Sequence, residues 1–352
     1  MSRVVIETKL ILRYPKYMKK VSLTGDRPSG PLHIGHLFGS LLSRKETEIE
    51  NESYVMVADV QALTDHFDQP EKIRENIYEI TADNLAVGLN PEKTTFFIQS
   101  KIPQIAELTV FFSNLVTVNT LKRNPTVKTE IAEKKDLFGQ EGESLTYGFL
   151  GYPVSQAADI TIVRAEVVPV GSDQLPMIEQ TREIVEKFHR TYPIKGNTFP
   201  LPIAKLSDAP KIIGLDGSAK MSKSLNNAIY LKDTPEKTAE KIKTAKTDSG
   251  SSIKELTDPN PSPSIYNLVR IYALIHNQKI IDAYKELDGM KYSPFKEKLA
   301  KDLNNYLSPI RERREELKPD YIKEVLDAGS KKVLKKAEET MALVKKAMRI
   351  DY

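Results

Sequence analysis

A glycine- and proline-rich turn between an apolar run and a helical pattern constrains the fold of this chain most. Residues 24–40 read TGDRPSGPLHIGHLFGS. The apolar run Val21–Thr24 predicts a buried strand, Gly25–Leu32 forms the turn, and a helical pattern runs from His33 to about Glu50. In open parallel sheets, ligands bind at the carboxyl ends of strands, where a helix N-terminus attracts phosphate. The turn therefore predicts an α/β fold with a phosphate site at its first strand.

The patterns that follow repeat this alternation of strand and helix. Apolar runs predict buried strands at Tyr54–Asp59, Thr94–Ile98 and Val167–Val170, and the helical segments between them include the strongly apolar Ile105–Val118. Such alternation is typical of a parallel sheet that is covered by helices. We expect a doubly wound parallel-sheet (Rossmann-like) domain over residues 18–225.

Strand patterns are absent from the last third of the chain. There we expect an all-helical domain over residues 226–318 and closing helices over residues 319–352, with a break at Gly329. Residues 1–17 precede the first patterned strand, and we interpret them as a dispensable N-terminal extension.

Composition excludes several kinds of site. The chain contains no cysteine, which excludes disulfides, thiolate zinc sites and a cysteine nucleophile. No segment reaches the roughly 18 uninterrupted apolar residues of a membrane helix, and the first residues lack the apolar block of a signal peptide. We expect a cytoplasmic protein that has no membrane partner.

Basic residues are concentrated near the C-terminus. Residues 231–352 hold 25 Lys and Arg against 20 Asp and Glu, whereas residues 1–230 hold 27 against 28. The C-terminal third is therefore the expected surface for a polyanion. Arg311, Arg313 and Arg314 are candidates for phosphate contacts, and the alternative is an ordinary charged helix face shared with neighbouring glutamates.

Two histidines open the first predicted helix. His33 and His36 are three residues apart, so they lie on one helix face and can reach one group together. Gly35 lies between them and would let a flat base approach the backbone, whereas Gly39 would do the same or allow close helix–strand packing. The spacing differs from the G-x-G-x-x-G of dinucleotide folds. The alternative is two structural histidines.

A second short motif, KMSKS, occupies residues 220–224. Two lysines that flank a hydroxyl in a small-residue loop can stabilise charge on a leaving pyrophosphate. Alone, such a loop is more often a solvated segment. Together with the HIGH tetrapeptide of residues 33–36, it indicates a nucleotide-activating enzyme.

With these two motifs the sequence resembles the class I aminoacyl-tRNA synthetases, whose signatures are HIGH and KMSKS. From about residue 20 to the end it looks like the bacterial-type tryptophanyl-tRNA synthetases. The likeness is carried by the segments GDRPSG, ADVQALTDH, NPTVKTE, GYPVSQAADI and VPVGSDQLPMIEQTREI.

The resemblance implies a two-step reaction in a catalytic domain that is joined to a helical anticodon-binding domain. ATP with Mg²⁺ would activate L-tryptophan to tryptophanyl-adenylate, and the acyl group would pass to the 3′-terminal adenosine of tRNA(Trp). It also implies a homodimer, for which Ile105–Val118 is a plausible interface element or equally buried core, and no DNA partner. The implied catalytic residues are His33, His36, Lys220, Lys223 and Lys128. The implied ATP-binding residues are Arg27, Pro28, Ser29, Gly35, His36, Gly171, Ser172, Asp173, Ile212, Lys220, Met221, Ser222, Lys223 and Ser224.

The implied amino-acid pocket centres on three residues that share one face if they are helical: Tyr152, Gln156 and Asp159. Asp159 can accept a hydrogen bond from an indole N–H, but a carboxylate serves a phenol equally well, and tyrosine enzymes share this arrangement. Leu23 favours tryptophan, because tyrosine enzymes usually place a second phenol partner at that position. The remaining candidates are Asp59 and Gln61 for the ammonium group, or as caps of the next turn, and Gln174.

Three alternatives stay open on the sequence alone. A tyrosyl-tRNA synthetase would share the mechanism and the two signatures. A small-molecule nucleotidyltransferase shares an HxGH turn but needs neither the KMSKS loop nor the helical domain. A catalytically inactive RNA-binding paralogue would be expected to have lost His33, His36, Lys220 or Lys223, and all four are present.

Overall fold

The computed structural model describes residues 19–139, 142, 144–194, 196–206, 212–218, 221, 225, 227–254, 256 and 261–352. The N-terminal extension and four of the five KMSKS residues lie outside this part of the chain.

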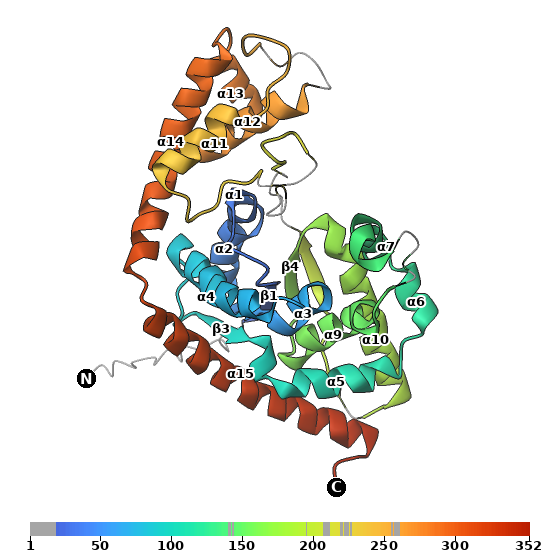
Figure 1. Cartoon of the computed structure of the whole chain (residues 1–352). Helices are drawn as coiled ribbons and strands as arrows, with labels where there is room; N and C mark the ends of the chain where they lie inside the picture. The colour runs from blue at the N-terminus through green and yellow to red at the C-terminus, as the bar shows by residue number, and fades with distance from the viewer. Residues whose placement is uncertain are drawn as a thin grey trace, which may run out of the picture.

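The described residues form one parallel sheet in the order β3-β2-β1-β4-β5 (Figure 1). Its strands are β1 (Val21–Asp26), β2 (Glu52–Val57), β3 (Thr94–Ile98), β4 (Val167–Val170) and β5 (Ile203–Leu206). β1 pairs with β2 on one side and β4 on the other, so the strand order reverses beside β1. The predicted parallel sheet is confirmed, whereas the edge strand β5 was missed.

Alternate residues of the strands are buried on opposite faces of the sheet. Tyr54 and Met56 of β2 pack in a core with residues of the helices α5, α9, α10 and α15, whereas Val55 and Val57 pack against α4 and the start of α15. A period of two with both faces buried is what a doubly wound sheet requires. The helices that surround the sheet are α3 (Asp59–His66), α4 (Pro70–Val87), α5 (Pro103–Ser113), α6 (Val118–Arg123), α7 (Pro125–Glu133), α8 (Lys135–Phe138), α9 (Tyr147–Ile162) and α10 (Leu175–Thr191), with short 3₁₀ turns η2 (Gln99–Lys101) and η3 (Ser172–Gln174).

Three predicted boundaries are wrong. The first strand, β1, ends at Asp26, two residues after the predicted end at Thr24. The second strand ends at Val57, and Asp59 begins helix α3 instead of ending the strand. The apolar run continues for one residue past the strand, to Ala58, so the sequence gives no signal for the strand's end at Val57. The apolar helix α5 starts at Pro103 and ends at Ser113, before Val118.

The helix that follows the glycine-rich turn is continuous but not uniform. It consists of α1 (Ile34–His36), a π-helical segment η1 (Leu37–Leu41) and α2 (Leu42–Glu50). His33 is its N-cap residue. π-Helical segments within α-helices are rare and frequently lie at functional sites.

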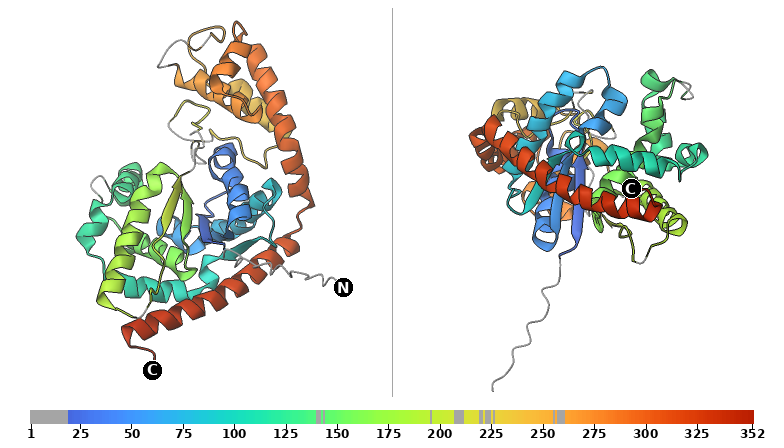
Figure 2. Two further views of the ribbon diagram at one scale, coloured as in Figure 1. Left: turned by 180° about the vertical axis from the view of Figure 1, so that it is seen from behind. Right: turned by 90° about the horizontal axis from the view of Figure 1, so that it is seen from below.

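A second unit of helices lies beyond the sheet (Figure 1). It contains α11 (Pro235–Thr244), α12 (Pro263–Ile275), α13 (Ile280–Glu286) and α14 (Tyr292–Glu316). The last helix, α15 (Pro319–Met348), runs back along the sheet domain (Figure 2). None of the described helices has the length and apolar character needed to cross a lipid bilayer.

The predicted break at Gly329 is wrong, because α15 is uninterrupted from Pro319 to Met348. A Cβ at Gly329 would lie only 1.8 Å from the carbonyl oxygen of Phe96 on β3. The glycine therefore lets the helix backbone touch the sheet backbone.

Candidate functional site

A cavity of about 740 Å³ opens at the carboxyl ends of β1, β2 and β4. This is the edge of the sheet at which the strand order reverses, where parallel sheets bind their ligands. The residues that the sequence analysis assigned to a ligand and that line this cavity are Leu23, Arg27, His36, Gln61, Tyr152, Gln156, Asp159, Gly171 and Gln174.

The two histidines of the turn are locked by backbone contacts. The N–H of Gly35 donates to Nδ1 of His33 (3.1 Å), and the N–H of His33 donates to Nδ1 of His36 (3.3 Å). A neutral imidazole carries its hydrogen on the other nitrogen when one nitrogen accepts. Each ring is thereby held with an Nε2–H donor. The His36 ring faces the cavity, so its donor can reach an anionic ligand there.

The two glycines beside these histidines have different roles. A Cβ at Gly35 would lie 2.8 Å from the His33 ring, so this glycine makes room for the histidine itself. Gly39 has open space where a Cβ would be, and it lines the cavity. The helix–strand packing considered for Gly39 is therefore wrong.

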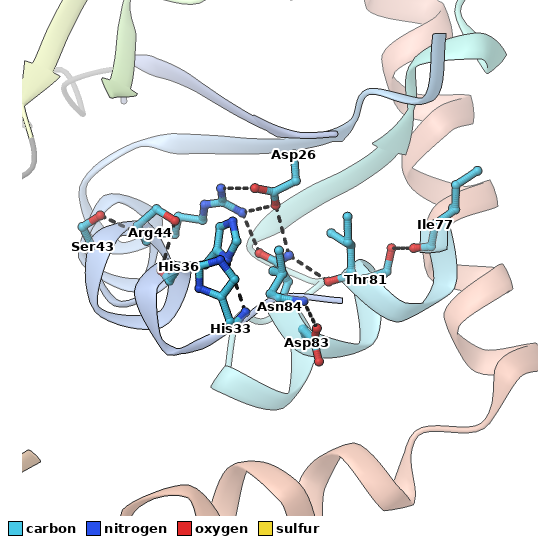
Figure 3. Close-up of polar contacts among 12 residues, drawn as sticks. Asp26, His33, His36, Ser43, Arg44, Ile77, Thr81, Asp83 and Asn84 are labelled. Carbon is cyan, nitrogen blue, oxygen red and sulfur yellow. Dashed lines mark hydrogen bonds and ion pairs between the residues drawn. The ribbon is translucent and has the colours of Figure 1, made fainter. Parts of the chain in front are cut away.

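A buried ion pair that the sequence analysis missed supports this turn (Figure 3). Arg44 on α2 donates through both terminal nitrogens to the Asp26 carboxylate (2.6 and 2.8 Å) and to Asn84 Oδ1 (2.8 Å). Burial of Asp26 alone would raise its pKa, but the charge and hydrogen bonds of Arg44, with a further hydrogen bond from Asn84, hold the pKa below its usual value. Asp26 and Arg44 line the cavity next to His36. Asp26 therefore stays ionised beside this histidine.

Helix α9 presents the predicted amino-acid residues on one face. Tyr152, Gln156 and Asp159 all line the cavity, which confirms the helical spacing. Asp159 is 1% exposed. Its Oδ1 accepts a hydrogen bond from Gln99 Nε2 (2.8 Å), while its Oδ2 is buried without a donor among the described residues.

The Asp159 carboxyl is poised to titrate near neutrality. Burial raises its pKa to about 7, the hydrogen bond from Gln99 opposes this, and the charge of Asp59 adds to it. Gln99 also accepts from the backbone N–H of Gln61 (3.0 Å), so it holds Asp159 against α3. Gln99 was missed, although a polar residue directly after the strand Thr94–Ile98 is a recognisable signal for this edge of the sheet.

A cluster of four charged side chains lies beside the cavity, and two of them, Arg27 and Glu130, line it. Arg27 Nη1 lies 3.4 Å from Asp65 Oδ2, and Arg27 Nη2 lies 3.8 Å from Glu130 Oε1. Lys134 Nζ also donates to Asp65 Oδ2 (2.5 Å). Glu130 lines the cavity beside Arg27. The sequence analysis assigned Lys128 in the NPTVKTE segment and overlooked Glu130 two residues later.

Asp59 does not face the cavity. Its two carboxylate oxygens accept from the backbone N–H and the hydroxyl of Ser100 in the 3₁₀ turn η2, 41 residues further along the chain. Asp59 therefore joins α3 to the turn after β3, which neither of the two predictions for it described. Gln61, two residues later in the same helix, does line the cavity.

Five other predicted ligand residues are not among those that line this cavity. Pro28 is buried and Ser29 is partly exposed in the turn, whereas Ser172 and Asp173 are exposed in η3 beside Gly171. Lys128 is exposed on α7. We retain their roles as predictions.

Two predicted ATP-binding residues in and near the KMSKS motif are packed in an apolar core. Ile212 and Met221 are both 5% exposed, in a cluster with residues of the first helix and the helical unit. The Met221 sulfur lies 3.9 Å from the position that a Cβ on Gly35 would take, so the second motif adjoins the first. Lys220, Ser222, Lys223 and Ser224 lie outside the described residues.

The arginines proposed for RNA contact are used inside the protein. Arg314 on α14 donates to Asp83 and Glu79 of α4 (2.8 and 2.9 Å), and Arg313 donates to the Ala86 carbonyl (2.6 Å). Arg311 donates to Asn304 and Thr238. The contacts of Arg313 and Arg314 join the two units, whereas those of Arg311 lie within the helical unit. The phosphate-contact interpretation of these arginines has no support in the structure.

Residues 19–308 match the family model described as tRNA synthetases class I (W and Y). A tryptophan–tRNA ligase of Streptococcus mutans is 44% identical over 342 residues, which is 95% of this chain and 99% of that protein. One of Streptococcus pyogenes is 45% identical over 344 residues, with the same coverage.

Solved structures of similar proteins agree in fold. A tryptophanyl-tRNA synthetase of Campylobacter jejuni, complexed with ADP and tryptophan, superposes with a TM-score of 0.78 at 30% identity and covers 94% of this chain and 99% of that one. The enzyme of Mycoplasma pneumoniae gives a TM-score of 0.80 at 28% identity and covers 94% and 98%.

Proposed function

The chain belongs to the class I tRNA synthetases that act on tryptophan and tyrosine, and on this premise we propose how its cavity serves the reaction. Its activity is that of a tryptophan–tRNA ligase. ATP occupies the part of the cavity next to the HIGH turn, and L-tryptophan lies along helix α9.

The buried Oδ2 of Asp159 carries the amino-acid assignment. A buried acceptor that lacks a donor costs about 1–3 kcal/mol, and Asp159 Oδ2 is such an acceptor on the cavity wall. An indole N–H satisfies it. A phenol O–H would also do so, but its oxygen then needs a donor of its own. Leu23, 3% exposed on the same wall, offers only apolar contact, which suits an indole ring.

The first step is an in-line attack by the amino-acid carboxylate on the α-phosphorus of ATP, with pyrophosphate leaving. No covalent bond to the protein forms, so positioning and charge stabilisation supply the rate enhancement. The His36 Nε2–H and the N-terminus of the first helix receive the phosphates. Arg27 neutralises charge near the reacting carboxylate, and Lys220 and Lys223 stabilise the pyrophosphate.

Mg²⁺ enters with ATP and is held mainly by phosphate oxygens. Within the described residues, no group of three or more His, Asp or Glu side chains could hold a metal ion. The chemistry of Mg²⁺ is to neutralise the charge that moves onto the leaving group.

The helical unit, residues 226–318, binds the anticodon of tRNA(Trp), and residues 319–352 close onto the sheet domain. The protein acts as a homodimer, and its α5–α6 surface is the interface. Ile105, Leu108 and Phe112 are buried, whereas Val110 and Val118 are 61% and 56% exposed. In the proposed dimer, a second copy covers these two exposed valines.

Charging of tRNA transcripts tests this function. We expect the protein with ATP and Mg²⁺ to esterify tRNA(Trp) with labelled tryptophan, and to leave tRNA(Tyr) uncharged with either tryptophan or tyrosine. Charging of tRNA(Tyr) with tyrosine would overturn the amino-acid assignment and the role given to Leu23.

A further inference from the structure

Among the described residues, four carboxylates line the cavity, and they differ in how many of their oxygens already accept a hydrogen bond. Asp26 is held by Arg44 and Asn84. Glu46 is exposed on α2. Asp159 and Glu130 each keep one buried oxygen, Oδ2 and Oε2 respectively, without a hydrogen-bond donor among the described residues. The cavity therefore has two buried acceptor oxygens that a ligand can satisfy.

L-Tryptophan carries two kinds of N–H donor, one at each end of the molecule. Its indole N–H is assigned to Asp159 above. Its α-ammonium group needs an acceptor at the other end of the amino-acid subsite, and a charged donor gains most from an ionised acceptor.

Glu130 lies at that other end. Tyr152 and Asp159 are seven residues apart on α9, which separates their Cα atoms by about 10 Å along the helix axis. Burial raises the pKa of Tyr152, and after burial the nearby negative charge of Glu130 is the largest contribution in the same direction. Glu130 is therefore a close neighbour of Tyr152 and lies two helical turns from the indole acceptor.

The charges around Glu130 are compatible with binding of the zwitterionic amino acid. The formal charges of this cluster sum to zero, since it contains Arg27, Lys134, Asp65 and Glu130. The ion pair between Arg27 and Glu130 is formed by Oε1 of the glutamate, at 3.8 Å. An ammonium group on Oε2 and a carboxylate toward Arg27 keep this balance. Asp59, one of the two candidates that the sequence offered for the ammonium group, accepts hydrogen bonds from Ser100.

We propose that Glu130, through Oε2, binds the α-ammonium group of the amino acid and so selects an α-amino acid over other indole compounds. This assignment rests on the proposed function, because it takes tryptophan as the ligand. It makes Glu130 a binding residue that sets how the reacting carboxylate is aimed.

Three ligands and three variants test the proposal by calorimetric titration. L-Tryptophan has both the ammonium and the carboxylate, tryptamine lacks the carboxylate, and indole-3-propionate lacks the ammonium. Glu130→Gln removes the charge with little change in shape. Glu133→Gln removes the same charge from the same helix at an exposed position outside the cavity lining, and it is the matched control.

Hydrogen bonds to charged groups contribute enough to predict a change of about 10- to 100-fold. We expect Glu130→Gln to raise the Kd of tryptophan and of tryptamine by this factor and to change that of indole-3-propionate less than about twofold. Glu133→Gln leaves all three unchanged. Glu130→Asp, which keeps the charge, regains part of the lost affinity for tryptophan.

Equal weakening of all three ligands by Glu130→Gln would overturn the proposal, because it would indicate a structural role. Unchanged tryptophan affinity in this variant would also overturn it. Both outcomes leave the proposed function intact. A wild-type protein that binds none of the three ligands would instead contradict the proposed function itself.

Discussion

Replacing Asp159 by asparagine is predicted to weaken tryptophan binding about 10- to 100-fold. Oδ1 of Asp159 accepts from Gln99 Nε2 (2.8 Å), and Oδ2 is the acceptor for the indole N–H. An asparagine has one acceptor oxygen, so either Gln99 or the indole faces an NH₂ group. The loss combines a charge-assisted hydrogen bond with a donor left unpaired, and hydrogen bonds to charged groups are worth about 1.5–3 kcal/mol.

The same change is predicted to stabilise the empty protein above neutral pH. The pKa of Asp159 is raised from 3.8 to about 7 in the folded protein. Below the ordinary pKa the carboxyl is protonated in both the folded and the unfolded chain, so its contribution to the free energy of unfolding is then fully present. That contribution is lost as the pH rises through about 7, and the shift corresponds to at most about 4 kcal/mol. Asparagine has no such loss. The advantage of Asp159→Asn in urea unfolding should therefore grow from about pH 4 to about pH 8.

Binding follows the opposite trend, because an indole N–H favours the ionised carboxyl. We expect the Kd of tryptophan for the wild-type protein to rise as the pH falls below about 7, by up to tenfold per unit. The Asp159→Asn variant should show no such dependence. The protein contains no tryptophan, so the fluorescence of the bound ligand reports binding directly. An analogue with sulfur in place of the indole N–H is the control and should bind with little pH dependence.

The reasoning would be refuted if Asp159→Asn lowered tryptophan affinity less than about twofold. It would equally be refuted if the variant lost stability relative to the wild-type protein as the pH rose.

Further predictions concern packing, the link between the two units and the loop outside the described residues. Gly329→Ala should destabilise the protein by about 3 kcal/mol or more in urea unfolding, the size of a severe packing defect. The control is Gly151→Ala in α9, where a Cβ meets open space, and it should change stability by less than about 1 kcal/mol. Arg314→Gln should destabilise by about 3 kcal/mol at alkaline pH and by less under acidic conditions, since Asp83, whose pKa burial raises to about 6, then takes up a proton. Lys223→Ala should lower kcat of pyrophosphate exchange about 100-fold and leave tryptophan affinity unchanged in a binding titration.

The parts of the site that could be predicted from sequence are those fixed by short-range geometry. The spacing of His33 and His36 places them on one turn, and the spacing of Tyr152, Gln156 and Asp159 places them on one helix face. In both cases the structure brings these side chains together as the periodicity indicates.

The parts that could not be predicted depend on contacts between distant segments. Gly329 looks like a helix break until the close approach of β3 explains it. Arg314 looks like a solvated residue until α4 supplies Asp83 and Glu79. β5 was missed because it is an edge strand whose residues are largely exposed, and such strands lack the apolar run of a central strand.

Glu130 illustrates the limit for function. The NPTVKTE segment was identified, but nothing in a single sequence says which of its charged residues faces a ligand. The fold decides it, because α7 turns Glu130 toward the cavity and leaves Lys128 exposed.

The most direct test of the account is exchange of labelled pyrophosphate into ATP, run with each of the twenty amino acids in turn. The account predicts exchange with tryptophan, abolished or strongly reduced in Asp159→Asn at the same tryptophan concentration. Exchange with tyrosine instead, or no exchange with any amino acid from folded protein and Mg²⁺, would contradict it.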